Sequence, residues 1–172
     1  MKKRVMVWVA VGASCAASAC VNEWTPVERA AEVARVQCTD PRVSQNEARI
    51  VRETTVIAVE PITFVTWSTR AQGGRTVGGT KLVVNAPDGV TADTLARVLQ
   101  CHTAKALLGE VEPAALAGDP FYLADGWIQS EVKSENGLLV VKLSADTVWQ
   151  NLIVLRRATA FADAHRAAPS VY

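Results

Sequence analysis

Three segments carry apolar residues at the spacing of an amphipathic helix. The first begins at Thr25-Pro26, followed by Glu28 in the order of a capping box, and should run to about Gln37. The second follows Thr91 and the third follows Ser144 or Asp146. The apolar face of the second consists of Leu95, Val98, Leu99, His102 and Ala106. That of the third consists of Val148, Leu152, Leu155, Thr159 and Ala162, with Trp149, Ile153 and Ala160 at its sides.

Three other segments predict β-structure. Residues 49–67 are rich in Thr, Val, Ile and Phe, and predict two strand segments joined at Glu60-Pro61. Residues 80–85 predict one strand, and residues 127–145 predict a hairpin turning at Asn136-Gly137. Pairing outward from this turn places Glu135 opposite Leu138, Lys133 opposite Val140, Val132 opposite Val141, Glu131 opposite Lys142, and Ser130 opposite Leu143.

Two connecting segments invite a functional interpretation. Residues 70–79 hold two Gly-Gly pairs, but the Lys-Ser/Thr ending of a phosphate loop is missing, so we expect a hairpin loop. Residues 110–126 form a long and rather apolar link. Such links are often functional, so Phe121, Tyr122 and Trp127 are a candidate binding lip. The alternative is a surface loop that its aromatic residues pin to the domain.

The order helix, strands, strand, helix, hairpin, helix predicts an α+β fold. We expect a two-layer sandwich, with helices on one face of an antiparallel or mixed sheet. From Lys81 onward the order also fits a ferredoxin-like split βαβ variant, whose closing strand would be missing or supplied from upstream.

The charge distribution excludes some classes of function, and the length limits the number of domains. Three of the 18 basic residues (Lys2, Lys3 and Arg4) lie at the start of the chain. The others are about as numerous as the 17 acidic residues and are interspersed with them, without a basic stripe. Nucleic-acid binding needs clustered positive charge, so we expect no nucleic-acid partner. Residues 20–172 are long enough for one domain with an apolar core.

The opening residues predict an export signal. Lys2 to Arg4 precede an apolar run over residues 5–13 that is too short to span a bilayer. The small residues that follow end in Ala17-Ser18-Ala19-Cys20, which resembles the lipobox of bacterial lipoproteins. This resemblance implies lipidation of Cys20 and, because Val21 follows, the outer membrane. Ala17 and Ala19 also suit ordinary signal cleavage, which would leave a periplasmic or secreted protein.

This interpretation divides the chain into a signal peptide over residues 1–19 and one exported domain over residues 20–172. A short tether at 20–25 and a frayed tail at 167–172 would flank the domain. Of the four cysteines, Cys15 leaves with the signal. If Cys20 carries lipid, Cys38 and Cys101 remain as an even pair in an oxidising compartment, and we predict a disulfide between them.

His102 is the residue that raises other possibilities. A metal site could combine it with His165 and an acidic residue, although the sequence has no Cys-x-x-Cys or His-x-x-x-His pattern. A small hydrolase could use it as a base beside Asp119, Asp125 or a serine, but no Gly-x-Ser-x-Gly pattern is present. The plainer interpretation is a core histidine with hydrogen-bonded ring nitrogens.

The expected function is therefore a non-catalytic cell-envelope protein that acts as a binding or structural module. A metal-binding periplasmic protein and a small hydrolase-like enzyme are the alternatives. We expect no cofactor, a membrane contact through the lipid on Cys20, and a small ligand or envelope protein as partner.

Overall fold

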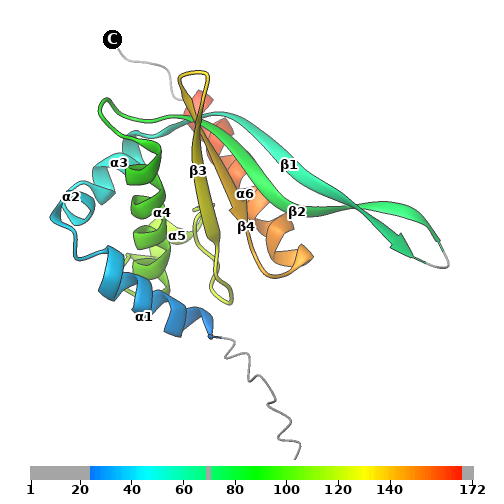
Figure 1. Ribbon diagram of the computed structural model, residues 1–172, viewed down its shortest axis with the longest axis horizontal. Coiled ribbons are helices and arrows are strands. Elements are labelled where there is room, and N and C mark those ends of the chain that lie inside the picture. Colours follow the sequence, from blue (N-terminus) through cyan, green and yellow to red (C-terminus); the bar gives the residue numbers. More distant parts are fainter. Residues whose placement is uncertain (1–23, 69–70, 168–172) are drawn as a thin grey trace, which may run out of the picture.

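The computed structural model describes residues 24–68 and 71–167. The helices are α1 (Pro26–Gln37), α2 (Pro41–Ser44), α3 (Glu47–Glu53), α4 (Ala92–Leu107), α5 (Pro113–Leu116) and α6 (Val148–Ala167). The strands are β1 (Thr55–Ser68), β2 (Ala71–Asn85), β3 (Gln129–Glu135) and β4 (Leu138–Ser144) (Figure 1). The expected signal peptide, the lipobox-like residues and residues 168–172 of the tail lie outside the described residues. Within the described ranges, no helix combines the length and the hydropathy of a membrane-spanning segment.

The sheet has the order β1-β2-β4-β3, and each neighbouring pair is antiparallel. Because β2 and β3 both run against β4, they are parallel to each other with β4 inserted between them. The segment β2-α4-β3 is thus a split βαβ unit. The position of the missing closing strand is taken by β1, which comes from upstream. The α+β fold class predicted from the sequence is confirmed, and the sheet is antiparallel.

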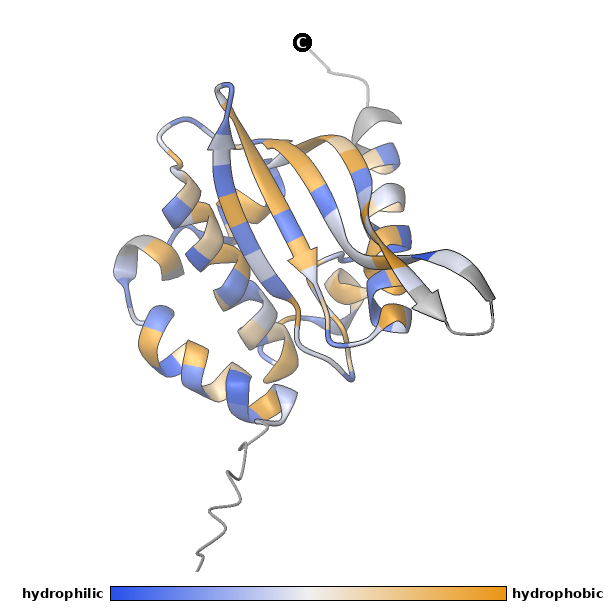
Figure 2. Cartoon of the chain, turned by 45° about the vertical axis from the view of Figure 1, so that its right-hand side comes forward, coloured by the Kyte–Doolittle hydropathy of each residue, from blue (hydrophilic) through white to orange (hydrophobic). Residues whose placement is uncertain are grey.

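One continuous core lies between the sheet and helices α4 and α6. It includes Leu82 and Val84 of β2, Val141 and Leu143 of β4, Leu95, Val98 and Leu99 of α4, and Val154, Ala158 and Ala162 of α6. In Figure 2, β3 is mostly hydrophilic with Val132 as its apolar position, whereas β4, in the middle of the sheet, is mostly hydrophobic.

Several local predictions are confirmed. Thr25 and Glu28 form the capping box of α1, and the Thr91 side chain caps α4. The β3–β4 hairpin has the predicted register, including Glu131 opposite Lys142. Asn136 and Gly137 both have positive φ, as their turn requires.

Residues 71–79, expected as a hairpin loop, belong instead to the long strand β2. Only Thr80 to Val84 of β2 pair with β4, so the outer parts of β1 and β2 extend beyond the sheet as a two-stranded ribbon (Figure 1). The glycines serve close packing there: a Cβ on Gly78 would lie 2.5 Å from the Phe64 ring, and one on Gly79 would lie 2.7 Å from the Leu143 carbonyl oxygen.

The prediction of two strand segments over 49–67 also needs correction. Residues up to Glu53 are helical in α3, where Arg49 and Glu53 form an i,i+4 ion pair at 3.1 Å. From Thr55 onward there is one strand with irregularities of register. Pro61 does not interrupt it, because β1 is an edge strand, and edge strands are where a sheet accommodates proline.

Helix α6 is rotated relative to the predicted apolar face. Its buried residues include Val154, Ala158 and Ala162, whereas Trp149 is 71% exposed and Leu152 is 40% exposed. The reason lies in Asn151. Its side-chain amide donates to the carbonyls of Ala145 and Thr147 (both 3.0 Å), and its side-chain oxygen accepts from the Ala145 backbone N–H (2.8 Å). These bonds fix the face that α6 turns to the sheet.

Candidate functional site

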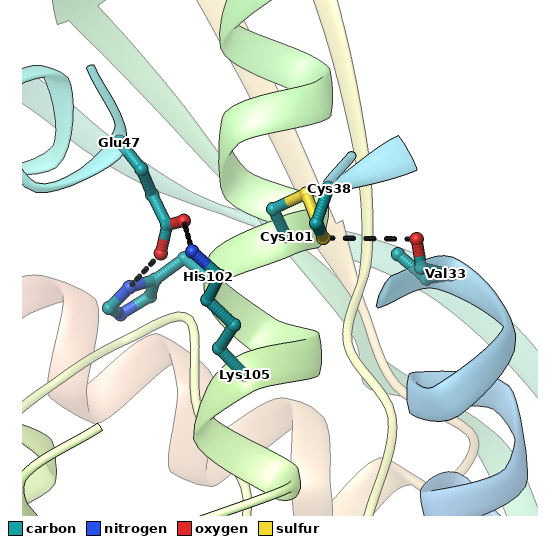
Figure 3. The surroundings of a disulfide bond; sticks show 6 residues. All are labelled: Val33, Cys38, Glu47, Cys101, His102 and Lys105. Carbon is teal, nitrogen blue, oxygen red and sulfur yellow. Dashed lines mark hydrogen bonds and ion pairs between the residues drawn. A yellow bond between two sulfur atoms is a disulfide. The ribbon is translucent and has the colours of Figure 1, made fainter. Parts of the chain in front are cut away.

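A disulfide joins Cys38, at the C-terminal end of α1, to Cys101 in the middle of α4 (Figure 3). The two Cα atoms are 5.5 Å apart, and the cysteines are 63 positions apart in the sequence. Cys101 is fully buried. The predicted pairing is confirmed, and it attaches the first helix of the domain covalently to α4.

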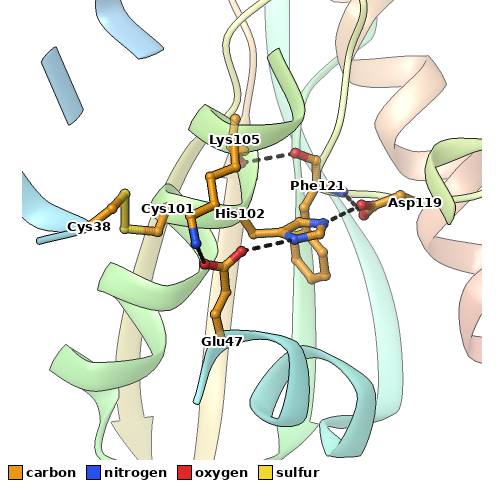
Figure 4. A network of polar contacts seen from close by, with 8 residues as sticks. Cys38, Glu47, Cys101, His102, Lys105, Asp119 and Phe121 are labelled. Atoms are coloured by element: carbon orange, nitrogen blue, oxygen red, sulfur yellow. Dashed lines mark hydrogen bonds and ion pairs between the residues drawn. A yellow bond between two sulfur atoms is a disulfide. The ribbon is translucent and has the colours of Figure 1, made fainter. Parts of the chain in front are cut away.

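A polar network occupies a different side of α4, because adjacent helical residues diverge by about a hundred degrees. His102 lies between two carboxylates that come from distant parts of the chain (Figure 4). Its Nε2 is 2.5 Å from Oδ2 of Asp119, and its Nδ1 is 3.6 Å from Oε1 of Glu47. The His102 side chain is only 12% exposed, and each carboxylate side chain is 9% exposed.

The other carboxylate oxygens also have donors. Lys105, one turn after His102 on α4, donates to Oε2 of Glu47 at 2.6 Å. The backbone N–H of Phe121 donates to Oδ1 of Asp119 at 2.8 Å, and the Thr103 hydroxyl donates to the Phe121 carbonyl at 2.9 Å. Two carboxylates therefore meet two cations, and the network is neutral when all four groups are charged.

The network holds three parts of the chain together. Glu47 begins α3, His102 and Lys105 belong to α4, and Asp119 belongs to the link between α4 and β3. Arg157 of α6 also donates to the Tyr122 carbonyl. The link is thus fixed to both long helices.

The charges of the network determine the protonation of His102. Burial lowers the pKa of its imidazole, but the hydrogen bonds and negative charges of Asp119 and Glu47 outweigh burial and raise the pKa to about 9. Burial raises the pKa of Glu47, but its bonds with His102 and Lys105 outweigh this, so its pKa is lower than usual. Near pH 7, His102 is therefore an imidazolium between two carboxylates.

This geometry bears on the roles considered for His102. Of the partners that the sequence suggested, Asp119 contacts His102, whereas Asp125 is exposed and accepts a hydrogen bond from Gln150 through its backbone carbonyl. A protonated imidazole can neither take up a proton as a base nor offer a lone pair to a metal. The His165 side chain lies outside the described part. Within that part, no three His, Cys, Asp or Glu side chains are grouped as metal ligands.

A cavity of about 600 Å³ opens beside the network. Glu47, His102 and Lys105 line one side of it. The rest of its lining comes from α3, from residues 110–115 and from α6: Ala48, Val51, Arg52, Glu110, Val111, Glu112, Ala115 and Phe161. We call this the His102 cavity. It combines an apolar wall with an Arg and two Glu side chains that are exposed.

The structure places the residues of the candidate binding lip largely in the interior. Phe121 is 5% exposed and Trp127 is 3% exposed, each in contact with a hydrophobic cluster, and Tyr122 is half-buried. Phe121 and Trp127 thus pack under the link instead of forming an open lip. The part of the link that does line a cavity lies earlier, at residues 110–115.

Sequence reasoning missed Glu47 and Lys105. Lys105 carried a usable signal, because residues three apart on a helix are neighbours and His102 was already placed on α4. Glu47 carried none, since it lies 58 positions before Lys105 and in a segment for which no helix or strand was predicted.

Comparison of the chain with models of known protein families, with curated proteins and with solved structures found no match.

Proposed function

We propose that the chain is a non-catalytic cell-envelope protein, tethered by a lipid on Cys20, that binds a small amphipathic ligand in the His102 cavity. The observation that carries the binding role is the cavity itself. It is about 600 Å³ in volume, which is in the range of small-molecule sites. Its apolar wall of Val51, Val111 and Phe161 suits a hydrophobic group, and its exposed Arg and Glu side chains suit a polar one.

Two features support the envelope assignment. The leader ends in the lipobox-like Ala17-Ser18-Ala19-Cys20. The Cys38–Cys101 disulfide is of a kind that persists in oxidising compartments and is rare in the cytosol. Since Val21 follows Cys20, the periplasmic side of the outer membrane is the proposed location. If Cys20 is not lipidated, the same signal would release the protein into the periplasm or the medium.

The state of His102 supports a non-catalytic role over both alternatives. A hydrolase base and a metal ligand each need a neutral imidazole with a free nitrogen, whereas both ring nitrogens of His102 face carboxylates. Elemental analysis showing stoichiometric zinc or copper would favour the metal-binding alternative with His165. Ester hydrolysis that is lost in His102→Gln would favour the enzyme.

The binding role is tested with anilinonaphthalene sulfonate, an amphipathic fluorescent probe. We expect saturable binding to the mature protein and loss of this binding in Ala115→Trp, whose indole would fill the cavity. Ala117→Trp is the matched control, because Ala117 is an exposed residue that does not line the cavity. Equal binding by both variants would refute the His102 cavity as the site.

The natural ligand requires a second experiment. Envelopes are crosslinked in cells that make the wild type, Ala115→Trp or Ala117→Trp, and the captured material is analysed by mass spectrometry. A compound present with the wild type and Ala117→Trp but absent with Ala115→Trp is the expected result.

The envelope assignment itself fails if the purified protein still begins at Met1 and fractionates with cytosolic markers.

A further inference from the structure

Helix α1 has two different faces. Ala30, which is fully buried, lies against Ala104 and Trp127, and Val33 and Ala34 are partly buried beside them. The outward side has exposed apolar side chains at both ends: Trp24 (49%) and Val27 (55%) at the beginning, and Val36 (55%) near the end. Trp24 and Val27 thus expose apolar surface at the same end of α1, and exposed apolar surface is a candidate contact for another phase or molecule.

The charged side chains of α1 balance in number, since Glu28 and Glu32 stand against Arg29 and Arg35. The Glu28 carboxylate accepts from the Thr25 backbone N–H and hydroxyl, at 2.8 and 2.9 Å. Further along, Glu32 and Arg35 form an ion pair at 2.6 Å. The beginning of α1 thus offers an apolar tip at Trp24 and Val27, and its later turns carry the Glu32–Arg35 ion pair beside the exposed Val36.

The position of this tip in the chain indicates what covers it. Only four residue steps separate Trp24 from Cys20, so the two Cα atoms can be no more than about 14 Å apart. A lipid on Cys20 would hold that residue at the membrane surface. The polar interface of a bilayer is about 5–8 Å deep on each side, and tryptophan is enriched there. The tip is therefore within reach of the interface.

We propose that the apolar tip formed by Trp24 and Val27 inserts into the membrane interface and makes a second contact beside the lipid anchor. This inference rests on the lipidation of Cys20 in the proposed function. Because α1 carries two acidic and two basic side chains, we expect an apolar insertion that does not depend on anionic lipid.

The test uses the lipidated protein purified from membranes and reconstituted into vesicles of phosphatidylethanolamine, with or without phosphatidylglycerol. Val27→Cys is labelled with an environment-sensitive dye, while the native disulfide leaves Cys38 and Cys101 unreactive. Glu135→Cys is the matched control, since it is exposed and lies at the β3–β4 turn, at the end of the body opposite α1 (Figure 1). Lipids that carry a spin label in the acyl chain serve as quenchers.

We expect a blue shift and loss of most of the emission for the label at 27, none for the label at 135, and the same result in both vesicle types and at high salt. A label at 27 that stays in water, on protein that is acylated and floats with the vesicles, would overturn the insertion and leave the anchor intact. Protein without an acyl mass would remove the anchor and the insertion together. Protection of the label before vesicles are added would assign the tip to a protein contact and also overturn the proposal.

Discussion

Alkaline pH should destabilise the fold through one identified group. His102 has a raised pKa in the folded protein, so its stabilising effect is fully present below its ordinary pKa and is lost as pH rises through about 9. The difference between an ordinary histidine pKa of about 6.5 and a folded value of about 9 corresponds to roughly 3 kcal/mol. The groups that face the imidazole are Glu47 and Asp119, and the lowered pKa of Glu47 keeps that carboxylate charged over this range.

The measurement is urea unfolding of the mature protein at intervals from pH 6 to pH 10. We expect the free energy of unfolding to fall by about 3 kcal/mol across this range, mostly between pH 7 and pH 9.5. In His102→Gln the curve should be flat over the same interval and lower at pH 7, because the two carboxylates then lack their shared cation. The slope of urea dependence should not change if both proteins unfold in two states.

Two results would refute this reasoning. A wild-type stability that stays constant from pH 7 to pH 10 would mean that the imidazolium is not the state that the carboxylates stabilise. A decline of the same size in His102→Gln would assign the effect to another group.

At acid pH the dependence has the opposite direction, and stability should fall as pH falls. Glu47 has a lowered pKa, so its contribution to stability is present above about 4.5 and is lost as pH falls through its folded value.

The remaining predictions concern packing and the disulfide. Cys38→Ser should lower the free energy of unfolding by roughly 4 kcal/mol in urea unfolding. Reductant should lower the free energy of unfolding of the wild type by a similar amount. Gly79→Ala should cost about 1–3 kcal/mol, because its Cβ would meet a backbone carbonyl, whereas Gly74→Ala, with 3.9 Å to its nearest neighbour, should cost little. Trp127→Ala should lower the stability by about 3–5 kcal/mol, and Trp149→Ala by under about 0.5, in thermal unfolding.

The parts of the fold that could be predicted are those set by neighbours in the sequence. The capping box at Thr25 and the turn at Asn136-Gly137 depend on a few adjacent residues, and both formed as expected. The register of the β3–β4 hairpin followed from its turn. The Cys38–Cys101 bond could be predicted because, once Cys15 and Cys20 are set aside, there was a single pair to form.

The parts that could not be predicted depend on contacts between distant segments. The glycines of residues 70–79 suggest a loop in the sequence. In the structure, Gly78 leaves room for the Phe64 ring and Gly79 for the Leu143 carbonyl, and both contacts are distant in the sequence. The side of α6 that faces the sheet is set by the hydrogen bonds of Asn151, and these leave Trp149 and Leu152 exposed. Only part of the candidate site could be predicted. The sequence suggested Asp119 as a partner of His102, but it did not predict helix α3, which places Glu47 beside the same imidazole.

Helix α4 is the element on which these interactions converge. One side is bonded covalently to the end of α1 through Cys101, and the next residue, His102, binds α3 and the 110–126 link through charge. The two attachments respond to different conditions, since reductant acts on the first and alkali on the second. If α1 also contacts the membrane, the disulfide and the packing of Ala30 on Ala104 and Trp127 together fix the rest of the body to that helix. The His102 network then shapes the cavity independently of the anchor, and ligand binding should survive removal of the lipid.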